Sequence, residues 1–221
     1  MLALVVGRTL FYAILLFGAA GTLDWPAGWL FLALYAGQML LTDVRLAQLD
    51  PELAQERRMP GKATSPPPWD RRFLMLSALL GPLWMILMGF DAVRFSWSRL
   101  PVALAVPGAV LMLLGAWISY AGLRANRFAS LIVRLQPDRG QHVVDTGPYA
   151  RVRHPIYAGA FLTALGAPLV LGSAWGLIGS GLLILLTARR AVLEERFLAD
   201  QLPGYRAYAA RVRWRVVPGL F

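Results

Sequence analysis

Six runs of apolar residues, separated by polar segments, make up most of the chain. The runs cover residues 2–20, 25–41, 73–90, 101–123, 157–171 and 175–188. A helix needs about 20 apolar residues to cross the hydrocarbon core of a bilayer, with a usual range of about 17–25. The first four runs meet this requirement, so we expect four membrane-spanning helices before residue 124.

The last two runs are shorter, and only Gly172, Ser173 and Ala174 separate them. We expect a tight C-terminal helical hairpin that either spans the membrane with tilt or enters it partway, for a total of five or six transmembrane helices. No Gly or Pro interrupts the chain between Leu182 and Leu202, so the last helix should continue past the bilayer. The first run lacks the basic residues that precede the apolar core of a signal peptide, which favours a retained span.

The composition agrees with an integral membrane protein. Of 221 residues, 57% are hydrophobic and 15% are charged, and the mean hydropathy is +0.54. Soluble globular domains average about 45–50% apolar and about 25% charged residues. The expected fold class is therefore an all-α, polytopic integral membrane protein, whereas intrinsic disorder and an ordinary cytosolic enzyme are disfavoured. Because the chain contains no cysteine, disulfides, thiolate metal sites and cysteine nucleophiles are excluded.

The basic residues predict how the helices are oriented. The chain carries 22 Lys and Arg against 12 Asp and Glu, for a formal net charge of +10. Most of the basic residues lie in three segments, 42–72, 124–155 and the tail after residue 188. With six spans these segments fall on one side of the membrane, and the positive-inside bias makes that side cytoplasmic, together with both termini. The same bias accounts for the positive charge, so no nucleic-acid partner is expected.

These patterns divide the chain into two regions. Residues 1–123 form the expected four-helix membrane region, with a cytoplasmic loop at 42–72 that contains a short amphipathic segment and a rigid proline run at 66–68. Residues 124–221 hold most of the polar residues that suit chemistry, in the loop before the hairpin and in the tail after it. Because both lie at the same mouth of the hairpin, they can converge on one site.

His154 and Pro155 mark the expected start of the fifth apolar helix. Proline suits the first turn of a helix, where its missing N–H costs nothing. His154 should therefore sit at a helix N-terminus on the membrane surface. Such a terminus offers free N–H groups and a partial positive charge, which suit a carboxylate or a ribose.

An acidic pair, Glu194 and Glu195, lies toward the end of the sixth expected helix. Arg190 and Glu194 share a helix face, but the order Arg before Glu is the weaker one for an ion pair. A carboxylate near a helix C-terminus also opposes the helix dipole, and the two adjacent glutamates repel each other. Local helix stability therefore does not explain the pair, which favours partners with a positive charge or a hydroxyl donor.

Each of these features also has a purely structural explanation. The arginines can be topology signals, the tyrosines can be interfacial belt aromatics, and a His-Pro pair is usually structural. With only His142 and His154 in the chain, no metal site is expected. A dinucleotide-binding loop is not expected either, because the glycine-rich part of the hairpin follows no strand. Its glycines indicate close helix packing instead, and they are Gly172, Gly176, Gly179 and Gly181.

One ordered set of residues is more specific. It begins with Gly147-Pro148-Tyr149-x-x-Val152-Arg153-His154-Pro155-x-Tyr157-x-Gly159 and continues with the apolar hairpin, Glu194-Glu195 and Tyr205-x-x-Tyr208. This set, within residues 126–221, resembles the isoprenylcysteine carboxyl methyltransferase family, and the related membrane phospholipid methyltransferases share much of it. Upstream, Glu56-Arg57 and Trp69-Asp70-Arg71 also look like bacterial members, which implies a bacterial inner membrane.

The resemblance implies an all-helical membrane enzyme that binds S-adenosyl-L-methionine in a cytoplasmic pocket between the loop before the hairpin and the tail after it. Arg190 would face the methyl acceptor, at its carboxylate. The acceptor would be a lipophilic or prenylated molecule that arrives from the bilayer, among membrane lipids. The expected cofactor residues are Gln141, His142, Val143, Val144, Tyr149, His154, Pro155, Tyr157 and Glu194, and Glu195 is the alternative to Glu194.

Three other functions compete with carboxyl methylation. In phospholipid N-methylation the acceptor is an amine, which Arg190 would serve poorly, so an oxygen acceptor is favoured. Sterol-type reductases that use NADPH share a His-Pro-x-Tyr element, but Ile156 and Ala160 stand here where those enzymes have Asn and an acid. A non-enzymatic membrane protein that kept the fold is the third alternative.

Overall fold

A computed structural model describes residues 2–58 and 66–221. Within these residues the fold is all-α, as the sequence predicted, and a single isolated bridge, between Val152 and Trp214, has β geometry. Four short helical turns lie at Phe90–Arg94, Val102–Leu104, Pro137–Arg139 and Gly147–Ala150. The helices are α1 (Leu2–Ala20), α2 (Pro26–Leu49), α3 (Pro51–Arg58), α4 (Pro68–Gly89), α5 (Ala105–Ala125), α6 (Pro155–Leu171), α7 (Ala174–Gln201) and α8 (Tyr205–Arg211).

Each of the six apolar runs lies in a helix. Of the described helices, α1, α2, α4, α5 and α7 are long and apolar enough to cross a membrane. The sixth, α6, has 17 residues and is therefore about 26 Å long at 1.5 Å per residue. The molecule is thus an all-helical polytopic membrane protein. As expected from its lack of Gly and Pro, α7 continues beyond its apolar run, to Gln201.

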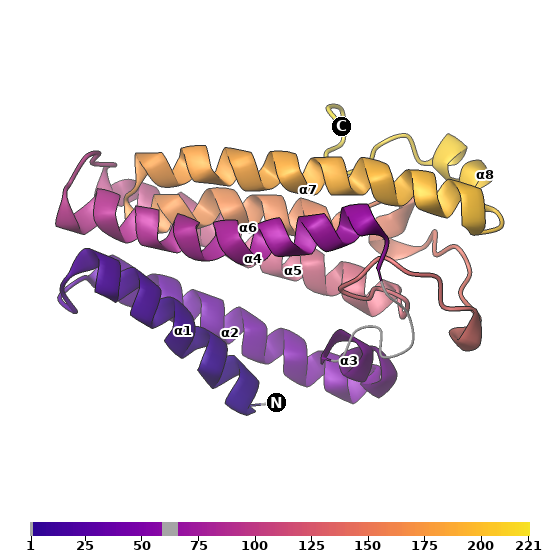
Figure 1. Ribbon diagram of the computed structural model, residues 1–221, viewed down its shortest axis with the longest axis horizontal. Helices are drawn as coiled ribbons and strands as arrows, with labels where there is room; N and C mark the ends of the chain where they lie inside the picture. Colours follow the sequence, from indigo (N-terminus) through magenta and orange to yellow (C-terminus); the bar gives the residue numbers. More distant parts are fainter. Residues whose placement is uncertain (1, 59–65) are drawn as a thin grey trace.

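The helices run in alternating directions along one long axis (Figure 1). At one end of the bundle lie α3, the segment 126–154 and α8, and we call this end the loop end. The three basic segments of the sequence meet there, as their alternation predicted. The α6–α7 hairpin closes at the other end, where Gly172 has φ +79° and ends α6. Glycine adopts this left-handed conformation without the steric cost that other residues meet.

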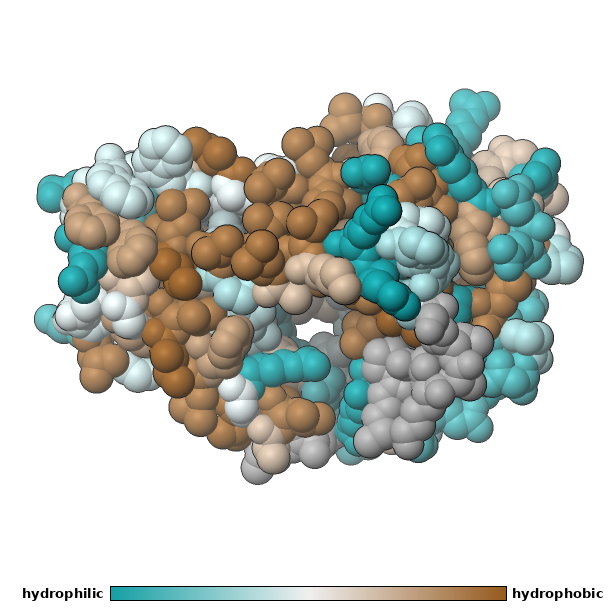
Figure 2. All heavy atoms as spheres, in the orientation of Figure 1, coloured by the Kyte–Doolittle hydropathy of each residue, from teal (hydrophilic) through white to brown (hydrophobic). Residues whose placement is uncertain are grey.

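Apolar side chains cover the middle of the molecule and hydrophilic ones gather at the loop end (Figure 2). Many large apolar residues are exposed on the outer faces of the helices, among them Ile14 on α1, Leu79 on α4 and Leu185 on α7. A soluble monomer rarely exposes so much contiguous apolar surface. This surface is consistent with helices that face lipid.

Close contact between α5 and α6 fixes the helix that starts at the site. A side-chain carbon added at Gly108 would lie 2.8 Å from the carbonyl oxygen of Gly166, and one added at Gly115 would lie 2.5 Å from that of Gly159. Small residues allow such backbone approach between membrane helices. Because no side chain separates the two backbones, the position of α6 follows that of α5.

The four hairpin glycines have different roles. Gly176 packs against Met88 and Pro168 and Gly179 against Trp84, which confirms close packing at both. Gly172 instead forms the turn of the hairpin, and a side-chain carbon at Gly181 would meet no atom within 4 Å. The prediction was wrong for Gly181, because its Cα faces away from the neighbouring helices.

Two fully buried carboxylates, one at each end of α4, hold α7. At the hairpin end Asp91 accepts hydrogen bonds from Ser173 Oγ at 2.6 Å and from the Trp175 N–H at 3.2 Å, both at the start of α7. At the loop end Asp70 lies in the first turn of α4 and contacts Arg190 on α7. The second contact belongs to the candidate site.

Candidate functional site

A cavity of about 320 Å³ lies at the loop end of the bundle. Its walls come from the segments 126–134 and 141–149, the first turns of α6, the C-terminal half of α7, and α8, together with Arg57 of α3 and Phe73 of α4. Small-molecule sites usually occupy about 300–1,000 Å³. The cavity is therefore of a size that holds a small ligand or most of a larger one.

Nine of the ten residues that the sequence analysis assigned to the site line this cavity. They are Gln141, His142, Val143, Val144, Tyr149, His154, Tyr157, Arg190 and Glu194. The tenth, Pro155, is fully buried at the first position of α6, where its ring faces Gly122 of α5. It contributes indirectly, because it starts α6 directly after His154.

The loop before the hairpin and the C-terminal tail converge, as the sequence predicted. The backbone N–H of Arg153 donates to the Trp214 carbonyl at 2.9 Å, and that of His154 donates to the Arg215 carbonyl at 2.7 Å. His154 is the N-cap residue of α6. Its ring is buried and stacks on the Tyr157 ring, with centroids 5.1 Å apart and planes 5° apart. The tail therefore packs against the start of the helix that carries the site.

The acidic pair splits between two environments. Glu194 lines the cavity, and its Oε2 accepts a hydrogen bond from the Tyr157 hydroxyl at 2.6 Å. Glu195 instead accepts from Arg153 at 2.6 and 3.1 Å and from Arg215 at 2.8 Å. Both glutamates thus have the hydroxyl or cationic partners that the sequence analysis expected. Of the two, Glu194 is the one whose carboxylate faces the cavity.

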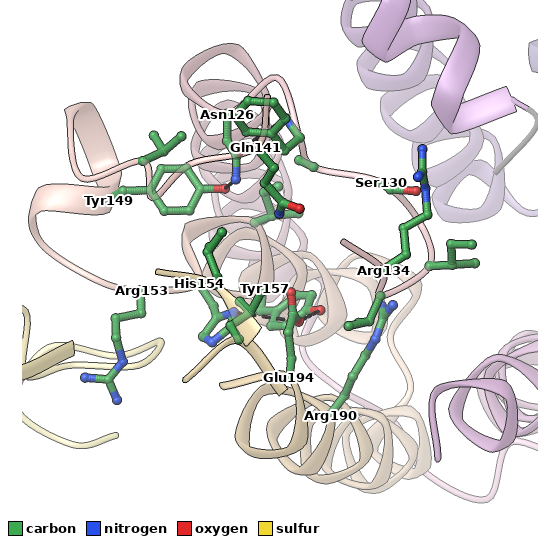
Figure 3. Close-up of a pocket in the computed structure, with 18 of the residues that line it drawn as sticks. Asn126, Ser130, Arg134, Gln141, Tyr149, Arg153, His154, Tyr157, Arg190 and Glu194 are labelled. Atoms are coloured by element: carbon green, nitrogen blue, oxygen red, sulfur yellow. Dashed lines mark hydrogen bonds and ion pairs between the residues drawn. The ribbon is translucent and has the colours of Figure 1, made fainter. Parts of the chain in front are cut away.

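Arg153 connects the hairpin to the tail. Besides its pair with Glu195, its Nη1 donates to the carbonyls of Val212 at 2.5 Å and Arg213 at 3.0 Å. In Figure 3 its guanidinium points away from Glu194, toward the tail. His154 lies beside the pair, with Nε2 at 3.3 Å from Glu195 Oε1 but without hydrogen-bond geometry. Arg153 and Glu195 therefore support the cavity from behind.

Arg190 has a partner that the sequence analysis did not identify. Its Nε donates to Asp70 Oδ1 at 2.9 Å, and its Nη2 donates to the Leu131 carbonyl at 2.7 Å. The guanidinium carbon lies 4.4 Å from the centroid of the Phe73 ring, within the range of a cation–π contact. Asp70 Oδ2 also accepts from the Val133 N–H at 2.8 Å. Asp70 thus holds both Arg190 and the 126–134 segment in place.

Helix α3 holds the same segment from the other side. Glu56 accepts hydrogen bonds from Ser130 Oγ at 2.8 Å and from Arg134 Nε and Nη2 at 3.1 and 3.0 Å. Burial alone would raise the pKa of the Glu56 carboxyl, but the hydrogen bonds from Arg134 and Ser130 outweigh it and lower the pKa. Arg57 Nη1 donates to the Ala129 carbonyl at 2.8 Å. The upstream Glu56-Arg57 element therefore forms part of the site.

Two buried tyrosines close the side of the cavity near α8. The Tyr208 hydroxyl donates to the Tyr149 carbonyl at 2.8 Å, and Asn126 Nδ2 donates to the Tyr149 hydroxyl at 3.3 Å. Burial raises the pKa of both phenols, so both stay neutral at physiological pH. They supply neutral hydroxyl groups and aromatic surface to the wall.

Asp70 and parts of the cavity wall carry signals that the sequence analysis did not connect to the hairpin. Asp70 follows the proline run as an acid in a first helical turn, where a carboxylate is favoured by the helix dipole. Asn126 ends α5, and the segment 128–134 is an apolar stretch with polar residues between two helices. No spacing in the sequence joins these residues to the hairpin, because 120 positions separate Asp70 from Arg190.

Among the described residues, no three His, Asp or Glu side chains are placed to hold a metal ion. Residues 104–203 match the family model for phospholipid methyltransferase (PEMT). No curated protein matches the chain. The matched part runs from the turn before α5 through α6 and α7, so it includes most of the cavity wall. Together with the five long apolar helices, this match supports a membrane methyltransferase.

Proposed function

We propose that the protein transfers a methyl group from S-adenosyl-L-methionine to a lipophilic acceptor, at a carboxylate oxygen. The observation that carries the proposal is the position of the cavity. Its polar residues come from the loop end and its hairpin helices continue into the apolar part of the bundle. A polar cofactor can therefore reach the cavity from the aqueous phase, and an apolar acceptor can reach it from the lipid.

The cavity residues fit S-adenosyl-L-methionine. The molecule has an ammonium group and ribose hydroxyls, which need acceptors, and an adenine ring, which needs apolar and aromatic surface. Glu194 uses Oε2 for Tyr157, and among the described residues Oε1 has no partner, so it can accept from the cofactor. Phe128, Tyr149 and the valines at 143 and 144 supply the apolar and aromatic surface. We therefore assign the cofactor to Glu194, Tyr149 and the 141–144 segment.

Bound in this way, the cofactor supplies an electrophilic methyl group on a sulfonium. A carboxylate acceptor needs no base, because it is already a nucleophile. The chain mainly has to hold the two reactants in line, an effect that can contribute about 7–11 kcal/mol. Arg190 is held by Asp70 and Leu131 through Nε and Nη2, which leaves Nη1 to donate to the acceptor. Arg190 is therefore our candidate for the residue that orients the acceptor carboxylate.

The loop end is the proposed cytoplasmic side. It carries the three basic segments, and positive charge in membrane proteins is concentrated in cytoplasmic loops. The cofactor would then enter from the cytoplasm of a bacterial cell with the protein in the inner membrane, and the acceptor would enter from the lipid.

Transfer to an amine is the second candidate function, because the matched family is named for phospholipid methylation. The charges of the cavity favour an anionic acceptor over a cationic one. Four arginines line it, whereas Glu194 is its one acidic side chain among the described residues. With Glu194 engaged by the cofactor, no acidic side chain of the described lining would remain for an amine acceptor. The family match gives no support to a reductase that uses NADPH.

The test is methyl transfer by the purified protein in lipid nanodiscs, with methyl-labelled S-adenosyl-L-methionine and a lipid extract of bacterial membranes. Carboxyl methylation should give solvent-extractable label that base treatment releases as methanol, because esters hydrolyse. Base-stable label in the lipid head group would instead establish N-methylation. Absence of label, together with absence of S-adenosylhomocysteine binding, would refute methyl transfer.

A further inference from the structure

Four arginines line the cavity, and three of them are matched by carboxylates. The pairs are Arg134 with Glu56 at 3.0 Å, Arg153 with Glu195 at 2.6 Å, and Arg190 with Asp70 at 2.9 Å. The fourth, Arg57, donates to the Ala129 carbonyl at 2.8 Å, and no carboxylate of the described residues lies within 4 Å of it. The neighbouring segment 59–65 cannot supply one, because it contains no Asp or Glu.

Arg57 remains charged although it is partly removed from water. Burial lowers the pKa of its guanidinium, Asp43 partly offsets this effect, and the charge of Arg190 lowers the pKa further. An arginine stays protonated in proteins despite such shifts. A charge that is taken out of water without a counter-charge in direct contact costs free energy. The cavity thus contains one cation that a bound anion would stabilise.

The charges in the cavity indicate how many negative charges are missing. For the arginines that line the cavity the three pairs cancel, and Glu194 contributes one negative charge; Arg215, which also contacts Glu195, lies outside the lining. The bound cofactor contributes a net single positive charge, from its sulfonium and its amino-carboxylate, which offsets Glu194. Arg57 is left over. One negative charge on the second ligand would balance the site.

We propose that Arg57 binds the anionic head of the methyl acceptor, a carboxylate or phosphate carried on an apolar chain. This inference rests on the proposed function, which it deepens by adding a second residue to Arg190: Asp70 already matches the charge of Arg190, and Arg57 supplies the unmatched positive charge. A guanidinium presents two N–H donors in a plane and so matches the two oxygens of such a head group. Arg57 has donors to spare, since Nη1 alone is used by Ala129.

For a carboxylate head, methyl transfer would remove the charge that Arg57 recognises. The O–CH₃ bond forms with an electron pair of the carboxylate, and the S–CH₃ bond breaks with its pair returning to sulfur. The carboxylate and sulfonium charges disappear together, and no proton moves. Arg57 would again lack a counter-ion beside a neutral ester. The product should therefore bind more weakly than the acid from which it formed.

The experiment compares four probes with the same twelve-carbon chain in neutral detergent, namely laurate, dodecyl phosphate, lauramide and methyl laurate. Binding is measured by calorimetry on the protein saturated with sinefungin, an unreactive analogue of S-adenosyl-L-methionine whose extra ammonium group keeps the positive charge of the sulfonium. Wild-type protein should bind an anionic probe at least about tenfold more tightly than lauramide or methyl laurate, as expected for a hydrogen-bonded charge. A preference for laurate over dodecyl phosphate would identify a carboxylate head, and the reverse a lipid phosphate.

Three variants test the role of Arg57. Arg57→Gln should lose the anion preference, and Arg57→Lys should keep part of it. Arg58→Gln removes the same charge from the next residue, which is exposed and outside the cavity wall, and should behave like wild type. Equal binding of all four probes by wild type, or anion preference retained in Arg57→Gln, would overturn the assignment.

The binding of S-adenosylhomocysteine by itself keeps this result separate from the proposed function. All three variants should retain that affinity, which also shows that they fold. If wild type fails to bind S-adenosylhomocysteine, the proposed methyl transfer is wrong. If it binds S-adenosylhomocysteine and shows no anion preference, the Arg57 assignment alone is wrong.

Discussion

Glu194 and Glu195 are adjacent in the chain and differ completely in what surrounds them. The first has one hydroxyl partner and faces the cavity, whereas the second is held by two arginines behind it. The difference arises because consecutive residues on a helix point about 100° apart. The two carboxylates therefore offer a matched pair of substitutions with opposite expected effects.

Glu194→Gln should weaken the binding of S-adenosylhomocysteine about tenfold or more, because a charged acceptor is replaced by a neutral amide. Its thermal midpoint should change little. Glu195→Gln should instead lower stability by about 3–5 kcal/mol, since it leaves Arg153 buried without a counter-charge. Calorimetry and thermal unfolding in detergent measure the two effects. The reverse pattern would show that Glu195 contacts the cofactor.

A double-mutant cycle should detect the energetic coupling between Asp70 and Arg190. Asp70→Asn should destabilise the protein by about 3–5 kcal/mol, because Arg190 is left as an unmatched buried charge. In an Arg190→Gln background the same change should cost much less, since residues in contact are not additive. Thermal unfolding of the four proteins checks the coupling.

Asp91→Asn is the control for this cycle. Asp91 is equally buried, lies at the opposite end of α4 and also bonds to α7, but it does not contact Arg190. Its effect should therefore be the same in the wild-type and Arg190→Gln backgrounds. Additivity of Asp70→Asn with Arg190→Gln would contradict the assigned pair.

At the scale of elements, the helices could be predicted from the sequence better than the contacts between them. The hairpin could be located from features that act within one helix. These are the length of each apolar run, Pro155, and the absence of Gly and Pro after Leu182. The partner of Arg190 was missed, since spacing within α7 points to Glu194 while folding brings Asp70 from α4. The sequence shows which residues share a helix face, but which faces contact each other depends on how the helices pack.

Helix α3 shows how a short element positions the site, and its stability should depend on pH. The pKa of Glu56 in the folded protein is below its ordinary value of 4.5. The stability that the ionised Glu56 carboxylate contributes is therefore complete above about pH 4.5. It is lost as the pH falls through the lower, folded value. Glu56→Gln should thus cost stability at pH 7 and progressively less toward acid pH.

Thermal unfolding of wild type and Glu56→Gln between pH 7 and acid pH measures this difference. Glu52→Gln serves as the control, because Glu52 lies on the same helix with 68% of its side chain exposed in its pair with Arg127. An exposed pair contributes little, so this variant should match wild type throughout. A constant difference between wild type and Glu56→Gln would argue against a pH-dependent contribution from Glu56.

For the whole molecule, the central question is which end of the bundle faces the cytoplasm. The chain contains no cysteine, so single cysteines can report their side of the membrane without background. Asp24→Cys lies at the hairpin end and Ala207→Cys at the loop end, both at exposed positions. In spheroplasts, an impermeant maleimide should label the Asp24→Cys variant at once and the Ala207→Cys variant only after permeabilisation. The opposite result would invert the proposed orientation.

The pairing of the 212–216 segment with the start of α6 has a consequence for biosynthesis. Trp214 and Arg215 accept hydrogen bonds from Arg153 and His154, so a ribosome must synthesise the chain as far as Arg215 before this side of the cavity can form. All six apolar runs precede this segment in the chain. Nascent chains that stop short of this point would insert normally and yet be unable to complete the pocket.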